Sequence, residues 1–138
     1  MRKLIALAIL LAFCVTLGMA GTVVAQKKHA PKGVWKGMVA NLSDIQGITA
    51  ALAVFDMERA TMFADGLVAR ERFVSNLERL PKAVRDGHAK VVVVAEELAA
   101  ATRSGDEQMI SMKIGAVLAA CSSCHYDIRD AERRKKLE

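Results

Sequence analysis

Apolar residues recur every three or four positions along four stretches of this chain, and this spacing constrains the fold more than any other feature. A step of three or four keeps side chains on one face of an α-helix, so each stretch predicts an amphipathic helix with one buried stripe. The predicted helices cover residues 34–55, 57–80, 82–102 and 107 towards the C-terminus. Short joints between helices of similar length predict an all-α, antiparallel, up-down-up-down four-helix bundle.

Residues at the joints support these boundaries. Asp56 can cap the second helix, and Pro81 ends it because proline has no backbone N–H to donate. Gly105 suits a left-handed helix cap, and its neighbours Ser104 and Asp106 can each begin the fourth helix. The joints therefore carry both stop and start signals for the helices.

Composition agrees with this fold class. Aromatic residues make up 4% of the 138 residues and there are only two prolines, so a sheet of β-branched and aromatic side chains is disfavoured. The second helix has one weaker stretch, residues 70–72, where it could bend or break. Lys and Arg number 20 against 15 Asp and Glu, an excess too small for nucleic-acid binding.

The N-terminal segment is typical of a secretory signal peptide. Arg2 and Lys3 precede an apolar run over residues 4–15, and small residues end at Ala25 before a polar stretch. This pattern predicts a signal peptide over residues 1–25, export to the periplasm and a mature domain over residues 26–138. An uncleaved membrane anchor over residues 4–25 is the alternative.

The short purely apolar run favours cleavage over anchoring, so no stable membrane insertion is expected of the mature chain. Cleavage would discard Cys14 and leave Cys121 and Cys124 as the cysteines of the mature chain. The exported compartment would not hold thiols reduced unless something uses them.

One motif carries chemistry. Residues 121–125 read Cys-Ser-Ser-Cys-His, which is the Cys-x-x-Cys-His signature of covalent c-type haem attachment. Each thiol adds across a haem vinyl group, and the adjacent imidazole reaches the iron from the same side. The motif predicts one haem c bound by Cys121 and Cys124, with His125 as the proximal iron ligand.

Three other uses of the two cysteines compete with haem attachment. A thioredoxin-like dithiol needs a strand before the helix, and the chain shows no strand pattern. A zinc site needs two further ligands, yet His29 and His88 lie far away in the sequence. A disulfide between residues three apart in a regular helix is geometrically awkward. The combination of motif and export signal favours haem.

The motif also lies on the buried stripe of its helix. Cys121, Cys124 and His125 occupy positions i, i+3 and i+4, on the face that also carries the apolar residues Ile110, Ile114, Val117 and Ile128. The haem would then replace part of the core, and folding should depend on the haem between the helices.

With these features the chain resembles the cytochrome c prime family, the class II c-type cytochromes including their low-spin relatives. The resemblance covers the mature chain and rests on the single motif near the C-terminus, on residues 124–129 with Arg four positions after His, and on Met38, Asn41, Leu42 and Ile45 in the first helix. It implies that Arg129 lies near His125 on the proximal side. The family's Arg in the first helix is missing, with Lys32 or Lys36 as substitutes for its haem contact.

The sixth iron position separates two functions within this family. In the low-spin branch a Met of the first helix binds the iron, which makes Met38 the candidate distal ligand and suits electron transfer. In the high-spin branch an apolar residue, here Trp35, Met38 or Leu42, covers an open site that binds nitric oxide or carbon monoxide. Met38 as an ordinary core residue remains an open alternative, and so does His88 as a distal or second axial ligand or as a satisfied or rim histidine.

The sequence thus predicts a periplasmic monohaem c-type cytochrome that carries one electron, and no enzyme. The alternatives are a five-coordinate gas-binding protein, a peroxidase using His88 or Asn41, and a dithiol oxidoreductase without haem. Lys and Arg near the start of the first helix and the end of the last predict a basic rim that attracts an acidic redox partner, or solvated termini. The resemblance also implies a homodimer through the first two helices.

Overall fold

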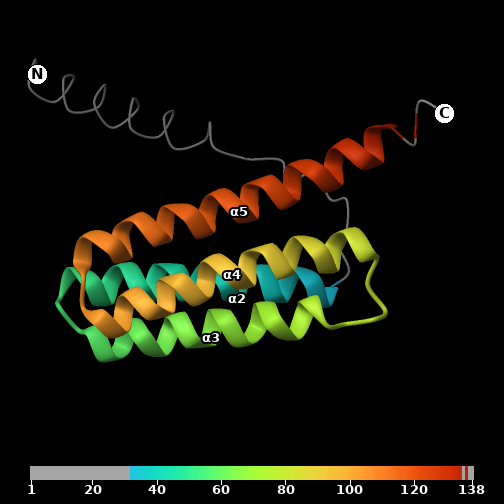
Figure 1. Cartoon of the computed structure of the whole chain (residues 1–138). Coiled ribbons are helices and arrows are strands. Elements are labelled where there is room, and N and C mark those ends of the chain that lie inside the picture. Colours follow the sequence, from blue (N-terminus) through green and yellow to red (C-terminus); the bar gives the residue numbers. More distant parts are fainter. Residues whose placement is uncertain (1–31, 135, 137–138) are drawn as a thin grey trace, which may run out of the picture. The chain divides into compact units, whose positions relative to one another are not determined.

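The chain folds into helices joined by short turns. The computed structural model describes residues 32–134 and residue 136, with side chains described from residue 36 on, so the predicted signal peptide lies outside the described residues. The helices are α2 (Lys32–Ala53), α3 (Met57–Ser75), α4 (Lys82–Ser104) and α5 (Glu107–Arg134) (Figure 1). The described part of the chain contains no strand. The prediction of an all-helical protein with four helices is confirmed.

The predicted caps are present at the joints. The carboxylate of Asp56 accepts a hydrogen bond from the backbone N–H of Arg59 at 3.0 Å, which satisfies a free donor at the start of α3. Gly105 ends α4 in the left-handed region with φ 71°. Asp106 accepts the backbone N–H of Met109 at 2.9 Å and so begins α5. Local capping chemistry therefore sets three of the helix boundaries.

Several details differ from the sequence expectation. α3 ends at Ser75 and not next to Pro81, because Asn76 is its C-cap residue and Pro81 directly precedes α4. α3 runs unbroken through residues 70–72, because Arg70 and Glu71 make polar contacts with neighbouring helices there. Phe55, taken as the last apolar position of the first helix, lies beyond the helix end in the left-handed region with φ 59° and is 73% exposed. α2 therefore ends two residues earlier than the apolar stripe suggests.

Helices that follow one another in the chain pack against each other: α2 against α3, α3 against α4, and α4 against α5. They alternate in direction, so the start of α2 and the end of α5 lie at the same end of the bundle (Figure 1). This end also holds the turn between α3 and α4, and we call it the motif end. The opposite end holds the α2–α3 and α4–α5 turns, and we call it the turn end.

One hydrophobic core joins all four helices and is concentrated towards the turn end. Its members run from Ile45 in α2, up to Val68 in α3, from Val91 in α4 and up to Val117 in α5. The largest of the fully buried apolar side chains are Ile48, Leu67, Leu98, Ile110 and Val117. Burying a side chain of this size contributes about 1.5–3 kcal/mol, so this cluster supplies most of the driving force for folding.

None of the described helices is long and apolar enough to cross a membrane.

Candidate functional site

The Cys-x-x-Cys-His motif lies in the part of α5 that has left the core. Both buried residues of α5, Ile110 and Val117, precede the motif. Cys121 is half-buried at the edge of the core, Cys124 is half-buried, and His125 is exposed. Figure 1 shows α5 diverging from the other three helices as it runs towards its C-terminal end.

A glycine lets α4 and α5 approach each other at the motif. A Cβ atom placed on Gly87 of α4 would lie 2.4 Å from the Sγ atom of Cys124. Real Cβ atoms do not come this close to another heavy atom, so any other residue at position 87 would have to displace the cysteine. Gly87 thereby seats Cys124 directly against the backbone of α4.

The prediction that His125 lies on the buried stripe of this helix is wrong, because His125 is exposed. Successive residues of an α-helix are rotated by about 100°, so His125 is turned by that angle from Cys124 and from its contact with α4. Leu118 lies seven residues before His125, two helical turns away, and is therefore on the same flank. Leu118 is 43% exposed, so this flank of α5 has no helix packed against it here.

The first half of α2 is also partly uncovered at the same end of the bundle, at Met38 and Leu42. Met38, Leu42 and Ile45 are spaced by four and three residues and share one stripe. Ile45 is buried, Met38 is half-buried, and Leu42 is 52% exposed. Among the described residues α2 and α5 form no interface comparable to those between helices adjacent in sequence. We call these two faces together the open seam.

Beneath the motif the bundle interior is polar. At the motif end the described residues that are buried are Asn41, Glu71, Gly87 and His88, one or two from each of α2, α3 and α4. Glu71 is 2% exposed and lies in the same stripe as Ala60, Ala64 and Leu67, so it points into the centre of the bundle. A buried carboxylate is stable only when its oxygens are hydrogen-bonded.

Both oxygens of Glu71 are occupied. Oε2 lies 2.6 Å from Nδ1 of His88, and Oε1 accepts a hydrogen bond from the side-chain amide of Asn41. The amide oxygen of Asn41 in turn accepts from Nε of Arg70 at 2.8 Å. Arg70 also pairs with Asp44, which is at the outer edge of the α2–α3 interface. One hydrogen-bonded network thus connects α2, α3 and α4 below the motif.

The surroundings of the two cysteines favour the protonated thiol. Burial, and then the negative charge of Glu71, raise the pKa of Cys121 from 9.0 to about 11. Burial, Glu71 and Asp127 also raise the pKa of Cys124, against a smaller opposing effect of Lys90. Both cysteines are free thiols in the structure. A thiol of raised pKa is a poor nucleophile at neutral pH.

The structure places the residues predicted from the sequence in two groups. Cys121, Cys124 and His125 are together on α5, and Nε of Arg129 donates to the backbone carbonyl of His125 at 3.2 Å, which puts Arg129 beside the motif histidine. Met38 lies on α2 at the same end of the bundle, within the open seam. The candidate site residues therefore all lie at the motif end of the bundle.

Sequence reasoning did not single out Glu71 or Gly87, and it gave Asn41 only a minor role. Glu71 follows Ala60, Ala64 and Leu67 at helical spacing, which is the signal that could have found it. Residues 70–72 were expected to be a weaker stretch where the helix could bend or break. The contact between Gly87 and Cys124 joins residues far apart in the sequence, and no local pattern announces it.

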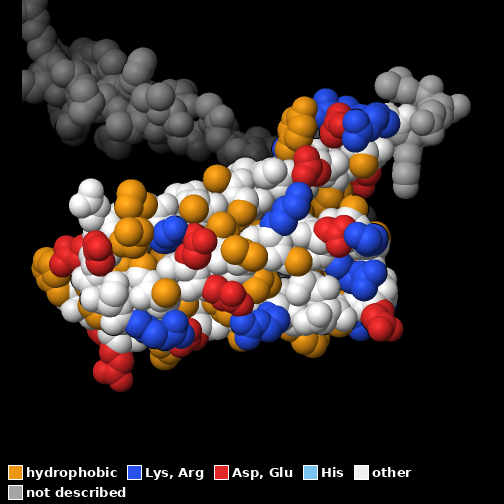
Figure 2. Space-filling view, in the orientation of Figure 1, with side chains coloured by type: hydrophobic (Ala, Val, Ile, Leu, Met, Phe, Trp, Pro, Cys, Tyr) orange, Lys and Arg blue, Asp and Glu red, His pale blue; other side chains and the backbone are white. Residues whose placement is uncertain are grey.

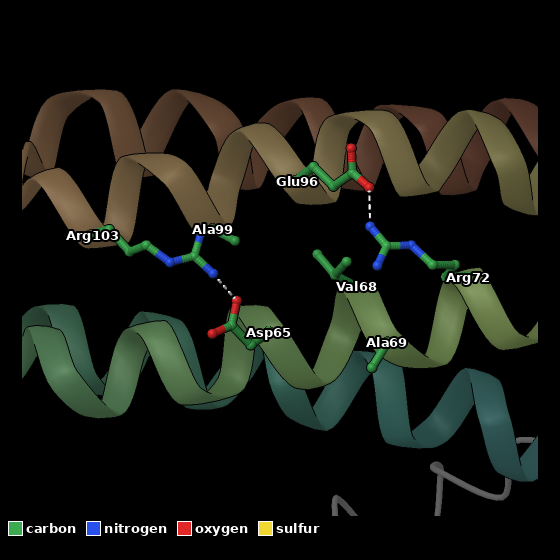
Figure 3. Close-up of a pocket in the computed structure, with 7 residues that line it drawn as sticks. All are labelled: Asp65, Val68, Ala69, Arg72, Glu96, Ala99 and Arg103. Atoms are coloured by element: carbon green, nitrogen blue, oxygen red, sulfur yellow. Dashed lines mark hydrogen bonds and ion pairs between the residues drawn. The ribbon is translucent and has the colours of Figure 1, made fainter.

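A second concave surface lies between α3 and α4, on the outside of the bundle (Figure 3). Val68, Ala69 and Ala99 form its floor, and two ion pairs, Arg103 with Asp65 and Arg72 with Glu96, bridge the two helices across it. Its charged side chains are partly exposed and already paired. Exposed ion pairs contribute little to stability, and this groove offers no unpaired group for chemistry.

Charge is mixed over much of the molecular surface. Figure 2 shows Lys and Arg interspersed with Asp and Glu over α3 and α4, and basic side chains gathered near the end of α5. Exposed residues there include Arg129, Arg133, Arg134 and Lys136, with Asp130 paired to Arg134 at 3.0 Å. This basic end is the region where a basic rim was expected.

No protein-family model, curated protein sequence or solved structure matches this chain. Within the described part of the chain no three His, Cys, Asp or Glu side chains are grouped so that they could hold a metal ion by themselves.

Proposed function

We propose that this protein is an exported monohaem c-type cytochrome of the class II kind, which carries one electron between redox proteins in the periplasm. Cys121 and Cys124 would bind one haem covalently, and His125 would be the proximal iron ligand. The observation that carries the proposal is the position of the motif: Cys121 and Cys124 are half-buried near the polar interior with Glu71, and His125 lies on an exposed flank of α5.

The residues present fit a covalently bound haem. Gly87 has no side chain, so the sulfur of Cys124 can lie close to the α4 backbone. Half-buried Met38 and exposed Leu42 and Leu118 give the seam apolar walls without a protein partner. A flat apolar ring between these walls would remove their exposed surface from water.

Each residue has a distinct role in this proposal. Cys121 and Cys124 would hold the haem through thioether bonds to their sulfur atoms and so fix its position. The imidazole of His125 would bind the iron, and Arg129 lies beside the backbone of that histidine. When bound, the haem supplies an iron that changes between the ferric and ferrous states by one electron.

The thiol pKa values argue against the competing dithiol function. A dithiol oxidoreductase needs a thiolate at neutral pH, and its attacking cysteine typically has a lowered pKa. Here burial and Glu71 raise the pKa of Cys121 to about 11. The motif cysteines are therefore poorly suited to disulfide exchange, whereas a thioether bond to haem leaves no thiol to ionise.

Met38 is the proposed sixth ligand, which would complete the coordination of the iron and favour electron transfer over ligand binding. The second candidate function is binding of nitric oxide or carbon monoxide at a vacant sixth site. The exposed Leu42 favours it, because a leucine on the same stripe as Met38 can cover the iron without binding it.

An absorption spectrum of the exported protein, oxidised and reduced, tests the proposal, with carbon monoxide then added to the reduced form. A low-spin spectrum that the gas does not change supports the electron carrier. A high-spin spectrum that shifts with the gas supports the gas-binding alternative. Absence of a haem spectrum from protein matured with haem available contradicts both.

A Met38→Leu variant tests the sixth ligand separately. If Met38 binds the iron, this variant becomes sensitive to carbon monoxide while it keeps its covalent haem. Met112→Leu is the matched control, because Met112 is 55% exposed on the first half of α5, before the motif. A Met38→Leu spectrum identical to that of the wild type would make Met38 an ordinary side chain of the seam.

A further inference from the structure

One buried polar atom at the motif end has no hydrogen-bond partner among the described residues. It is Nε of Arg85, near the start of α4. The Arg85 side chain is half-buried, and Nε is the one buried side-chain nitrogen or oxygen of the described residues that forms no hydrogen bond. An N–H group shielded from water without an acceptor is destabilising, so this atom requires an acceptor that the described residues do not supply.

The positive charge of Arg85 is unpaired as well. A guanidinium group stays charged at every pH at which proteins fold, so this charge does not depend on a titration. No Asp or Glu of the described residues forms an ion pair with it. Its sequence neighbour Asp86 is paired with Lys82 at 2.6 Å. Both oxygens of the buried Glu71 are occupied by their partners in the polar network.

Arg85 borders the polar interior at the outer end of α4. It precedes His88 by three residues, so the two side chains are neighbours on the helix surface. His88 is buried and contacts Glu71, which places Arg85 one turn nearer to the end of the bundle. Gly87, against which the sulfur of Cys124 lies, is in the same turn. Because successive residues are rotated by about 100°, His88 lies between Gly87 and Arg85 around the helix, and Arg85 is turned away from α5.

The proposed haem would bring acceptors of the required kind to this end of the bundle. Haem carries two carboxylate side chains on the edge of the ring opposite its vinyl groups. A ring attached to α5 through the vinyl groups therefore turns its carboxylates away from α5. Arginine binds a carboxylate through two parallel N–H···O bonds, and one of the two donors can be Nε. One such contact would satisfy both the buried donor and the unpaired charge.

We propose that Arg85 binds a carboxylate side chain of the haem through its Nε hydrogen, and so fixes the ring at the edge away from its thioether bonds. This inference rests on the proposed cytochrome function. The carboxylate stays ionised and the guanidinium stays protonated, so the contact needs no proton or electron. Because the guanidinium balances a negative charge near the iron, it also favours the ferrous state over the ferric state.

Arg85→Met in the haem-bound protein tests this contact, because methionine keeps an unbranched apolar stem and lacks the charge and the donors. Its reduction potential and its denaturant midpoint should both be lower than those of the wild type. Arg79→Met is the matched control, since Arg79 is exposed in the α3–α4 turn at the same end and water screens its charge. That variant should keep both values. Arg85→Lys retains the charge without Nε, so it should keep more of the potential than Arg85→Met.

An Arg85 that serves the packing alone gives a different result. If its Nε stays unpaired when haem is bound, Arg85→Met removes a buried donor that has no acceptor. The denaturant midpoint would then stay the same or rise, and the reduction potential would change no more than in Arg79→Met. Either of these two results would overturn the inference.

A structure of the haem-bound wild-type protein is a second test, which does not depend on a folded variant. A carboxylate oxygen of the haem should lie within about 3.2 Å of Nε of Arg85. An Nε that has another acceptor or none would overturn the inference. Failure of the proposed function is distinct, because the protein would then carry no covalent haem. A covalent haem whose carboxylates do not contact Arg85 contradicts only the role of Arg85.

Discussion

The two ends of this bundle are built from different kinds of side chain. At the turn end the interior is apolar, and its buried polar residue, Thr102, donates its hydroxyl to the backbone of Ala99 at 2.9 Å. At the motif end the buried side chains are Asn41, Glu71 and His88, and α5 diverges from the other helices. At the turn end protein side chains alone fill the interior. At the motif end the buried polar side chains and the diverging helix are typical of a binding site. Both lie on the same four helices, so helix formation alone does not distinguish them.

The largest effect is expected from removing both motif cysteines. Cys121→Ala combined with Cys124→Ala should abolish covalent haem binding, because no other described cysteine can form the two thioether bonds. The readout is haem that stays with the chain after denaturation. Ser122→Ala combined with Ser123→Ala is the control within the same motif, since both serines are exposed, and it should retain haem. Full haem retention in the cysteine variant would show that the motif cysteines do not bind the haem. The motif end would then not differ from the turn end as a haem site.

The next effect tests the turn end. Leu98→Ala should destabilise the protein by about 2–5 kcal/mol, since Leu98 is fully buried and its truncation leaves a cavity. Chemical denaturation measures this change in the free energy of unfolding. Leu118→Ala, on the exposed flank of α5, should change it by no more than about 0.5 kcal/mol in the haem-free protein. Equal costs at both positions would contradict the difference in packing between the two ends.

A third prediction concerns the Cys121 thiol in protein prepared without haem. Its pKa is raised above 9.0 in the folded protein, so the protonated form is favoured and the thiolate is scarce at pH 8. The rate of alkylation by iodoacetamide should keep rising with pH to about 11 in the folded protein. In the protein unfolded by guanidinium it should level off near 9.0. Alkylation that is already maximal at pH 8 in the folded protein would show that burial and Glu71 do not raise the pKa of Cys121.

The same shift has a consequence for stability. Because the pKa of Cys121 is higher in the folded state than the value of 9.0 expected for the unfolded state, folding is favoured below pH 9.0. This contribution is lost as pH rises from 9.0 to about 11. Replacing Cys121 by Ser should remove that part of the alkaline loss of stability.

The smallest effect tests the close contact at the motif. Gly87→Ala should destabilise the haem-free protein by about 1–3 kcal/mol, because the new Cβ would overlap the sulfur of Cys124. Gly115→Ala on α5 is the matched control, since a Cβ there meets open space. That change should stabilise the helix by up to about 1 kcal/mol. A stabilising Gly87→Ala would show that α4 and α5 are further apart than the structure has them.

The two ends also differ in how much of their structure could be predicted from the sequence. The helices and their caps follow from local spacing and from residues such as Asp56 and Gly105, so they could be predicted. The burial of His88 also followed from its place on an apolar stripe. Its partner Glu71 lies on another helix, 17 residues earlier, and the pairing becomes visible only when α3 and α4 are packed together.

The apolar pattern predicted more buried side chains at the motif end than the structure has. Leu42 continues the stripe of α2 and was expected to be buried, yet it is 52% exposed, because no helix covers this part of α2. Ile128 continues the stripe of α5 in the same way and is only half-buried. A sequence pattern marks the face that is to be covered and does not say whether protein or a cofactor covers it.

The mass of the intact protein, exported and matured with haem available, tests the central claim most directly. The account predicts a chain that begins after residue 25 and carries the added mass of one haem, with neither Cys121 nor Cys124 open to alkylation after denaturation. A chain of protein mass alone, with both thiols open to alkylation, would contradict it.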